Sequence, residues 1–165
     1  MCEERTRHAT NRLLAKLGLG ADPEDIAALF CRKVDWAVPG DASALPWIGR
    51  RSVGRRTVAD YIRQSRALVE PGAFVVTDIL VQGERAVILG ERCCCLRQTG
   101  RSVETEFAIV LTVTCGRITR FRLLEDSFAV SQASRSCSST GNHSTCFAIG
   151  SGHSNRTDAD PNSVL

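Results

Sequence analysis

Asp35 is the residue of this chain best placed to act as a general base. It stands between Val34 and Trp36 in an otherwise apolar stretch, where a carboxylate that faces a pocket would lose its water. Desolvation disfavours the charged form, raises the pKa of a carboxylate and allows it to take up a proton near neutral pH. The alternative is an acid that faces solvent or caps a neighbouring element. We expect Asp35 to be catalytic.

Arg92 is the least expected residue for a protein core. Alternation along a strand puts it on one face with Cys94 and Leu96. A buried guanidinium requires an anionic partner, either a carboxylate of the protein or a ligand. Two uses are open: a salt bridge that closes a pocket, or the binding of an anion or enolate. The candidate carboxylates within the chain are Asp35, Asp78 and Glu125.

Aromatic side chains could complete such a site. Tyr61, the only tyrosine, lies on the inner face of a predicted helix and could donate a hydrogen bond into the pocket, or simply pack with its hydroxyl at the rim. Trp36 and Trp47 flank a loop, where planar side chains would stack on a flat ligand. Core packing explains either tryptophan equally well.

Three further acids could face the pocket: Glu104, Glu106 and Asp126. Glu104 and Glu106 share one strand face, but the opposite face, with Thr105 and Phe107, is more apolar and better suited to a pocket. We therefore expect the two glutamates to face outward or toward a partner subunit. Asp126 follows the last predicted strand, where it could act in catalysis or cap a final helical turn.

Hydrophobic periodicity predicts helices first and strands afterwards. Asp22 is a suitable N-cap and Pro23 a suitable first residue for the second helix. Tight turns join the last four strands into an antiparallel meander, so we predict an α+β fold with the helices on one face of the sheet. The predicted elements are helices 4–17, 23–30 and 55–68 and strands 34–38, 74–81, 86–96, 103–114 and 117–124.

Composition excludes several classes of protein. The chain has 165 residues, a net charge of +3 and no apolar run long enough to span a membrane, so fibrous, membrane-embedded and wholly disordered proteins are excluded. Its mild basicity does not predict nucleic-acid binding. There is no Cys-x-x-Cys pair among the eight cysteines, and the three histidines lie in polar terminal stretches. We expect no metal, and no His to activate Cys94 as a nucleophile.

The two ends of the chain carry separate predictions. The opening residues are charged and no apolar segment follows them, which predicts a cytoplasmic protein without a signal peptide. Residues 134–165 are rich in Ser, Gly, Asn and Asp and contain few large hydrophobic residues. We predict a pocket domain over residues 1–133 and a flexible tail over 134–165.

Several short strings, together with the order of elements, resemble the SnoaL-like group of the nuclear-transport-factor-2-like superfamily over about residues 5–133. The resemblance implies a cone-shaped α+β fold in which a curved sheet wraps around the helices and encloses an apolar pocket. Ketosteroid isomerase, limonene epoxide hydrolase and polyketide cyclases share this fold. The strings are Val34–Gly40, Pro46–Gly49 with Gly54, Thr99–Arg101, and Gly116–Ile118 leading to Leu124–Asp126.

Comparison with two enzymes of the superfamily favours one reaction over the other. In the epoxide hydrolases an Arg is followed two residues later by an acid, positions that fall here on Arg92 and Cys94, and their second acid falls on Leu123. The carboxylate that shuttles the proton in ketosteroid isomerase falls near Asp35. Its donor acid falls in the apolar strand around Phe107. Half of the isomerase machinery is therefore present.

The resemblance implies an enzyme that acts on a hydrophobic polyketide, steroid-like or terpenoid-like substrate as an isomerase or cyclase, without a cofactor. Asp35 would abstract a proton next to a carbonyl, and Arg92 or Tyr61 would stabilise the oxyanion. A non-catalytic ligand-binding or dimerisation module and an epoxide hydrolase with rearranged acids are the alternatives. A homodimer formed through the outer sheet face is implied, with no nucleic-acid or membrane partner. The expected substrate-binding residues are Trp36, Trp47, Cys94, Leu96, Phe107, Phe121, Leu123 and Asp126.

Overall fold

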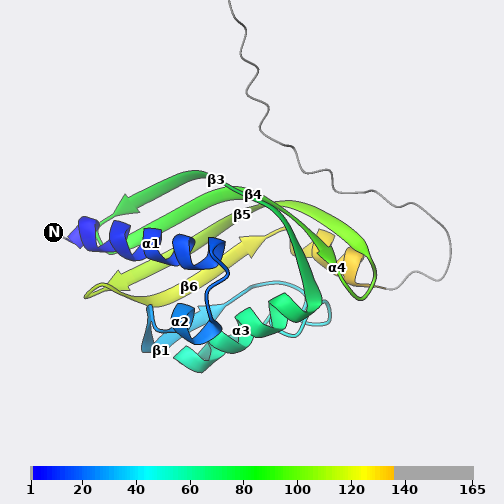
Figure 1. Cartoon of the computed structure of the whole chain (residues 1–165), viewed down its shortest axis with the longest axis horizontal. Helices are drawn as coiled ribbons and strands as arrows, with labels where there is room; N and C mark the ends of the chain where they lie inside the picture. The colour runs from blue at the N-terminus through cyan, green and yellow to red at the C-terminus, as the bar shows by residue number, and fades with distance from the viewer. Residues whose placement is uncertain (1, 136–165) are drawn as a thin grey trace, which may run out of the picture.

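The structure is a computed structural model that describes residues 2–135, shown in colour in Figure 1. The predicted tail, residues 134–165, lies outside this range except for its first two residues. Helices and strands form two layers, as the α+β prediction requires. No helix within residues 2–135 combines the length and apolarity that crossing a membrane would need.

Two of the four helices begin at an aspartate whose side chain caps them. Asp22 accepts a hydrogen bond from the N–H of Glu24 and starts α2. Asp126 accepts from the N–H groups of Phe128 and Ala129 and starts α4 in the same way. The four helices are α1 (Cys2–Gly18), α2 (Pro23–Ala27), α3 (Arg55–Leu68) and α4 (Ser127–Ser134).

Six strands form one curved sheet in the order β2-β1-β6-β5-β4-β3. The predicted meander is confirmed, because β3, β4, β5 and β6 pair with their neighbours in antiparallel fashion. β1 joins β6 as a parallel neighbour, which places Trp36 opposite Phe121. The strands are β1 (Phe30–Ala37), β2 (Arg51–Val53), β3 (Val69–Gln82), β4 (Arg85–Leu96), β5 (Arg101–Thr114) and β6 (Arg117–Glu125).

The largest differences from the sequence-based prediction concern α2, β3 and β2. α2 ends at Ala27, because Phe30 pairs with Ile118 and opens β1. β3 begins at Val69, directly after α3, whereas the prediction began this strand at residue 74; its pairing with β4 shifts register between Pro71 and Phe74. The short strand β2 was not predicted. A short apolar run such as residues 29–31 fits either a helix or a strand, and the pairing of Phe30 with β6 makes it the start of a strand.

The helices cover one face of the sheet and form the core with it. In Figure 1, α1 crosses in front of the strands, and α2 and α3 lie together below it. Leu13 of α1, Ile26 of α2 and Val58 of α3 are at most 1% exposed, as are Ile88 and Leu111 on the strands. We call the helix-covered face of the sheet the inner face; it is the inside of the cone, and the inward-pointing side chains of the strands lie there.

Gly90 makes room for an aromatic side chain on the inner face of β4. A Cβ at this position would lie 2.6 Å from Cζ of Phe107 and 2.1 Å from the carbonyl oxygen of Val75. Phe107 occupies that space and stacks on Phe74 with ring centroids 4.6 Å apart. The absence of a side chain at Gly90 therefore lets the sheet hold this aromatic pair.

Replacement of Gly90 by Ala should lower the free energy of unfolding by about 2–3 kcal/mol, since neither a ring nor a backbone carbonyl can move aside easily. Urea unfolding followed by circular dichroism measures the change. Gly18→Ala is the matched control, because a Cβ there meets nothing within 4 Å. Equal stability of the two variants would contradict the packing argument.

Candidate functional site

A buried ion pair joins β4 to β6 inside the cone. Nε of Arg92 lies 3.3 Å from Oε2 of Glu125, and the two side chains are 19% and 3% exposed. Burial raises the pKa of Glu125, against the pull of the Arg92 charge. Burial disfavours the charge on Arg92 as well, but the Glu125 carboxylate beside it keeps the pKa of the guanidinium raised. Glu125 is thus a carboxylate of increased basicity held against a fixed cation.

Two more polar groups adjoin this pair. Nη2 of Arg92 lies 3.5 Å from Sγ of Cys94, the next inward residue of β4. The hydroxyl of Tyr61, on α3, is buried, and burial raises its pKa to about 12 while the nearby Arg92 charge opposes the rise. Tyr61 therefore keeps its proton at neutral pH and can donate it in a hydrogen bond.

Aromatic side chains form one wall of the site. Trp36 and Phe121 stack in parallel with ring centroids 3.9 Å apart. The ring of Tyr61 lies 4.9 Å from that of Trp36 and 5.6 Å from that of Trp47. Phe30 meets Trp36 edge to face. These rings pack against one another and belong to the hydrophobic core, with Trp36 and Phe121 3% and 4% exposed.

Three polar atoms of the cluster are buried without a hydrogen-bond partner among the described residues: Nε1 of Trp36, Nε of Arg92 and Oε2 of Glu125. A buried polar atom in this condition costs about 1–3 kcal/mol, so folded proteins rarely retain one. Two of the atoms are donors and one is an acceptor. Nε of Arg92 and Oε2 of Glu125 face each other as an ion pair, so Nε1 of Trp36 is the one of the three atoms without a charged neighbour of opposite sign in that pair.

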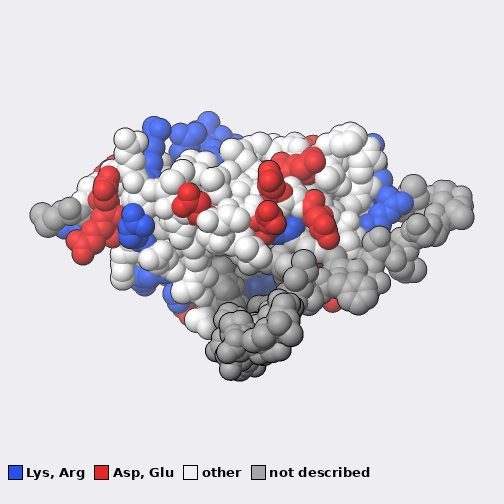
Figure 2. All heavy atoms as spheres, turned by 90° about the horizontal axis from the view of Figure 1, so that it is seen from above, with Lys and Arg blue, Asp and Glu red and all other residues white. Residues whose placement is uncertain are grey.

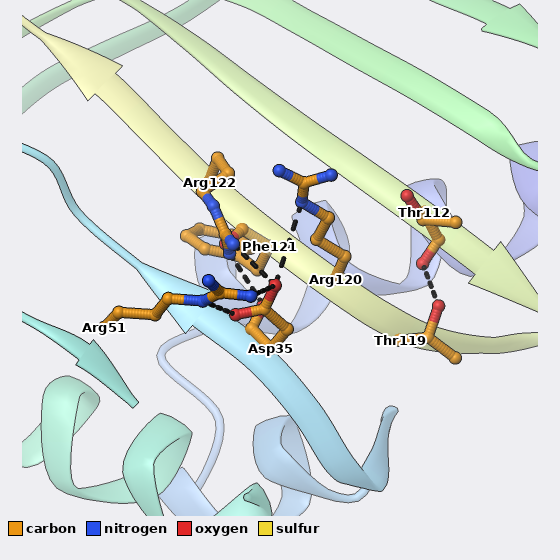
Figure 3. Close-up of polar contacts among 7 residues, drawn as sticks. All are labelled: Asp35, Arg51, Thr112, Thr119, Arg120, Phe121 and Arg122. Carbon is orange, nitrogen blue, oxygen red and sulfur yellow. Dashed lines mark hydrogen bonds and ion pairs between the residues drawn. The ribbon is translucent and has the colours of Figure 1, made fainter. Parts of the chain in front are cut away.

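Asp35 does not take part in this cluster. It lies on the outer face of β1, because the adjacent Trp36 points inward. Oδ1 and Oδ2 accept from Arg51 at 2.9 and 3.0 Å, and Oδ2 also accepts from Nη2 of Arg122 at 2.6 Å (Figure 3). Arg120 approaches to 4.0 Å.

These arginines reverse the expected electrostatics of Asp35. The hydrogen bond from Arg51 is the strongest influence, and with Arg122 it outweighs partial burial and lowers the pKa of Asp35 to about 2. The prediction of a raised pKa was wrong. Sequence reasoning considered the apolar neighbours of Asp35 along the chain and not the cations that β2 and β6 bring to its side.

Most of the other predicted site residues lie inside the cone. Trp36, Cys94 and Leu96 are buried, as are Phe107, Phe121 and Leu123, and Trp47 is 9% exposed. Asp126 is exposed, and its carboxylate caps α4, as one of the two alternatives stated. Glu104 and Glu106 face outward, as expected.

Glu125 was considered only as a possible partner of Arg92. The signal for a larger role was present in the alternation of β6, where Phe121, Leu123 and Glu125 share the inner face. Its proximity to Arg92 depends on β5, which separates the two strands. No spacing along the chain shows that proximity.

A second group of charges lies in a hollow of about 540 Å³ between α2 and α3. Arg63 pairs there with Glu24 and Asp60, and Arg56 also pairs with Asp60. These surface charges satisfy one another, so we assign the chemistry to the buried cluster. Within residues 2–135, no three His, Cys, Asp or Glu side chains are grouped so as to hold a metal ion.

Comparison with known proteins agrees with this architecture. Residues 12–121 match the SnoaL-like domain. No curated protein matches the chain closely enough to count as a relative. A solved NTF2-like protein from Burkholderia xenovorans is 20% identical, with a TM-score of 0.69 over 82% of this chain and 99% of that one.

Two solved structures with more specific names share the fold. A candidate SnoaL-like polyketide cyclase from Jannaschia is 14% identical, with a TM-score of 0.65 over 80% of this chain and 92% of that one. An epoxide hydrolase from M. tuberculosis, similar to limonene epoxide hydrolase, is 17% identical, with a TM-score of 0.60 over 79% and 90%. At these identities the likeness shows the fold.

Replacement of Asp35 by Asn should lower the free energy of unfolding at pH 7 by about 1–2 kcal/mol, allowing for solvent screening. The folded pKa is about 2 and the ordinary value 3.8, so this stabilisation is complete above about pH 4 and lost as the pH falls through 2. The two proteins should therefore converge in stability at low pH. Urea unfolding at pH 2, 4 and 7 measures the difference.

Asp25→Asn serves as the control for this series, since Asp25 is 67% exposed and lies 3.9 Å from Lys16. It should change stability little at any of the three pH values. A constant gap between Asp35→Asn and the unmodified protein from pH 7 to pH 2 would contradict the ion-pair explanation.

Proposed function

Since the chain belongs to the SnoaL-like family, we propose that it is an enzyme that isomerises or cyclises a hydrophobic small molecule by acid/base chemistry without a cofactor. The observation that carries the proposal is the buried Arg92–Glu125 ion pair, whose two facing atoms, 3.3 Å apart, make no hydrogen bond among the described residues. A polyketide, a steroid-like ketone or a terpenoid would each supply the apolar bulk and the oxygen that such a site accepts.

Glu125 is the proposed base. Its raised pKa makes it a stronger base than an ordinary carboxylate, and its Oε2 is held by the ion pair with Arg92 and not by a hydrogen bond. Asp35, with a pKa of about 2 and hydrogen bonds from Arg51 and Arg122, is a weak base that faces away from the cone. The role first expected of Asp35 therefore passes to Glu125.

Arg92 and Tyr61 are the proposed stabilisers of negative charge. When Glu125 removes a proton next to a carbonyl, the oxygen of that carbonyl becomes an enolate. The guanidinium of Arg92 and the neutral hydroxyl of Tyr61 are donors already in place, so little reorganisation is needed as the charge develops. Cys94, whose sulfur accepts a hydrogen bond from Arg92, adjoins these groups.

The aromatic wall is the proposed binding surface. The stacked pair of Trp36 and Phe121 supplies a flat face, and Trp47 adds a ring edge beside Tyr61. Stacking on such surfaces favours planar or fused-ring substrates. Nε1 of Trp36 would donate to an oxygen of the bound molecule.

Epoxide hydrolysis is the weaker candidate. It would require a water molecule and at least two carboxylates in one pocket, and the ion pair joins Arg92 to a single one, Glu125. The position at which the resemblance implies a further acid is the thiol of Cys94. This arrangement supports proton transfer by one carboxylate better than activation of water by two.

Glu125→Gln should reduce kcat/KM by a factor of about 100 or more while ligand binding survives, because the amide keeps the shape of the carboxylate but cannot accept the proton. Polycyclic enones and β-dicarbonyl esters, screened by ultraviolet absorbance, are suitable substrates. For the unmodified enzyme, kcat/KM should rise with pH through the raised pKa of Glu125, since the base must be ionised.

Glu4→Gln, on the exposed face of α1, is the control and should leave turnover unchanged. Turnover by Glu125→Gln at the unmodified rate would place the base elsewhere. Quenching of tryptophan fluorescence by these compounds without any turnover would support the binding module instead.

We also propose that the chain forms a homodimer through the outer face of the sheet. A largely apolar band crosses that face, interrupted by Asp78 beside Leu89 and by Arg122 beside Val110, and further charged residues lie on its two sides. Arg85, Thr112 and Arg120 lie in one row across the strands, and Glu91 lies opposite Glu106 in another. Acidic side chains gather over β3, β4 and β5 on the face seen in Figure 2. The apolar band consists of Leu80, Val87, Leu89, Ala108, Val110 and Leu124.

A second copy of this chain has the apolar band and the charges that complement this face. A two-fold axis in the interface, running across the strands along the apolar band, turns the basic row of one copy onto the acidic row of the other. Arg85 of each copy then faces Glu91 of the other. Exposed charges in these rows thereby set the orientation of the two subunits.

Arg85→Glu and Glu91→Arg should each dissociate the dimer, because like charges then meet twice across the axis. The double variant should restore the dimer, because the acidic and basic members of each Arg85–Glu91 contact have then exchanged places and opposite charges meet again. Sedimentation equilibrium at low ionic strength measures the subunit mass. A monomeric unmodified protein, or a double variant as weak as the single ones, would contradict this arrangement.

A further inference from the structure

Thr105 is a buried polar residue on the inner face of β5. It is 9% exposed, and the register of the sheet places it opposite Arg92. Its hydroxyl donates to the carbonyl oxygen of Glu106 at 2.8 Å and accepts from the N–H of Asp126 at 3.1 Å. Both hydrogen-bonding functions of the hydroxyl are therefore in use, and one of them reaches across to the end of β6.

The bond to Asp126 extends the sheet past its last backbone pair. β5 and β6 pair as far as Phe107 and Glu125, so the N–H of Asp126 lies just beyond that pairing. The Thr105 hydroxyl receives this N–H in place of a backbone carbonyl. The carboxylate of Asp126 then caps α4, so the peptide that follows Glu125 is held on both sides.

The carboxylate of Glu125 depends on this anchor. Its Oε2 has no hydrogen bond among the described residues, and its contact with Arg92 is an ion pair of 3.3 Å. An ion pair without directed hydrogen bonds orients a side chain weakly. The position of the carboxylate is then set chiefly by its own backbone, which Thr105 fixes one residue further on.

We propose that Thr105 is a positioning residue that holds the carboxylate of Glu125 against Arg92 through its hydrogen bond to the N–H of Asp126. The proposal rests on the proposed function of Glu125 as the base. Loss of the hydroxyl frees the end of β6, the ion pair lengthens, and the attraction that keeps Glu125 ionised becomes weaker.

Thr105→Val tests the proposal, because valine has nearly the same shape and lacks the hydroxyl. Thr112→Val is the matched control on the same strand, since Thr112 lies on the opposite face and pairs with Arg120. Thr105→Ser keeps the hydroxyl and should rescue the effect. All three variants are compared as the full chain, with folding checked by circular dichroism.

The readout is the titration of the Glu125 carboxyl carbon by NMR in protein labelled at glutamate, with the signal assigned from Glu125→Gln. In Thr105→Val the pKa of Glu125 should rise by about 0.5–1 unit, because the carboxylate stays buried while the opposing Arg92 charge acts from further away. Arg92 and the Tyr61 hydroxyl are the groups that face Glu125 in this measurement. Thr112→Val and Thr105→Ser should titrate like the unmodified protein.

An unchanged or lowered pKa of Glu125 in folded Thr105→Val, or an equal rise in Thr112→Val, would overturn the proposal. If the valine variant does not fold, Thr105→Ala is titrated in its place against the same controls. The titration uses no substrate, so its outcome is separate from that of the proposed function. A shifted pKa together with a fully active Glu125→Gln would retain the positioning role and reject the catalytic one.

Discussion

A guanidinium and a carboxylate buried side by side constrain everything around them. Removing either partner would strand a charge in an apolar interior, which is far costlier than keeping the pair. The Arg92–Glu125 contact therefore requires β4 and β6 to remain at the spacing that β5 provides. Tyr61, which lies close enough to both charges to be influenced by them, connects the pair to the aromatic residues Trp36 and Trp47.

The curvature of the sheet separates two electrostatic environments. On the inner face, burial is the main influence on Glu125 and raises its pKa. On the outer face, arginines surround Asp35 and lower its pKa, although the residues on either side of it along β1, Val34 and Trp36, are apolar. The pKa values of these two carboxylates are therefore shifted in opposite directions. The face of the sheet on which each carboxylate lies decides the direction of its shift.

Small residues maintain the geometry of the inner face. Gly90 leaves space for the ring of Phe107, and Thr105 supplies the hydrogen bond at the end of β6. Neither residue needs to touch a substrate for its loss to alter the site. The inner face consequently depends on packing and on backbone anchoring as much as on the groups proposed to do chemistry.

Local patterns were sufficient to predict the α+β class, the meander and the inward position of Arg92, because helix and strand periods and tight turns are properties of neighbouring residues. The resemblance carried by short strings implied the family that the domain match then showed. The partner of Arg92, the cations around Asp35 and the start of β1 at Phe30 required the folded chain. Each of these depends on pairing between strands far apart in sequence, and such pairing brings together charges that no spacing along the chain relates.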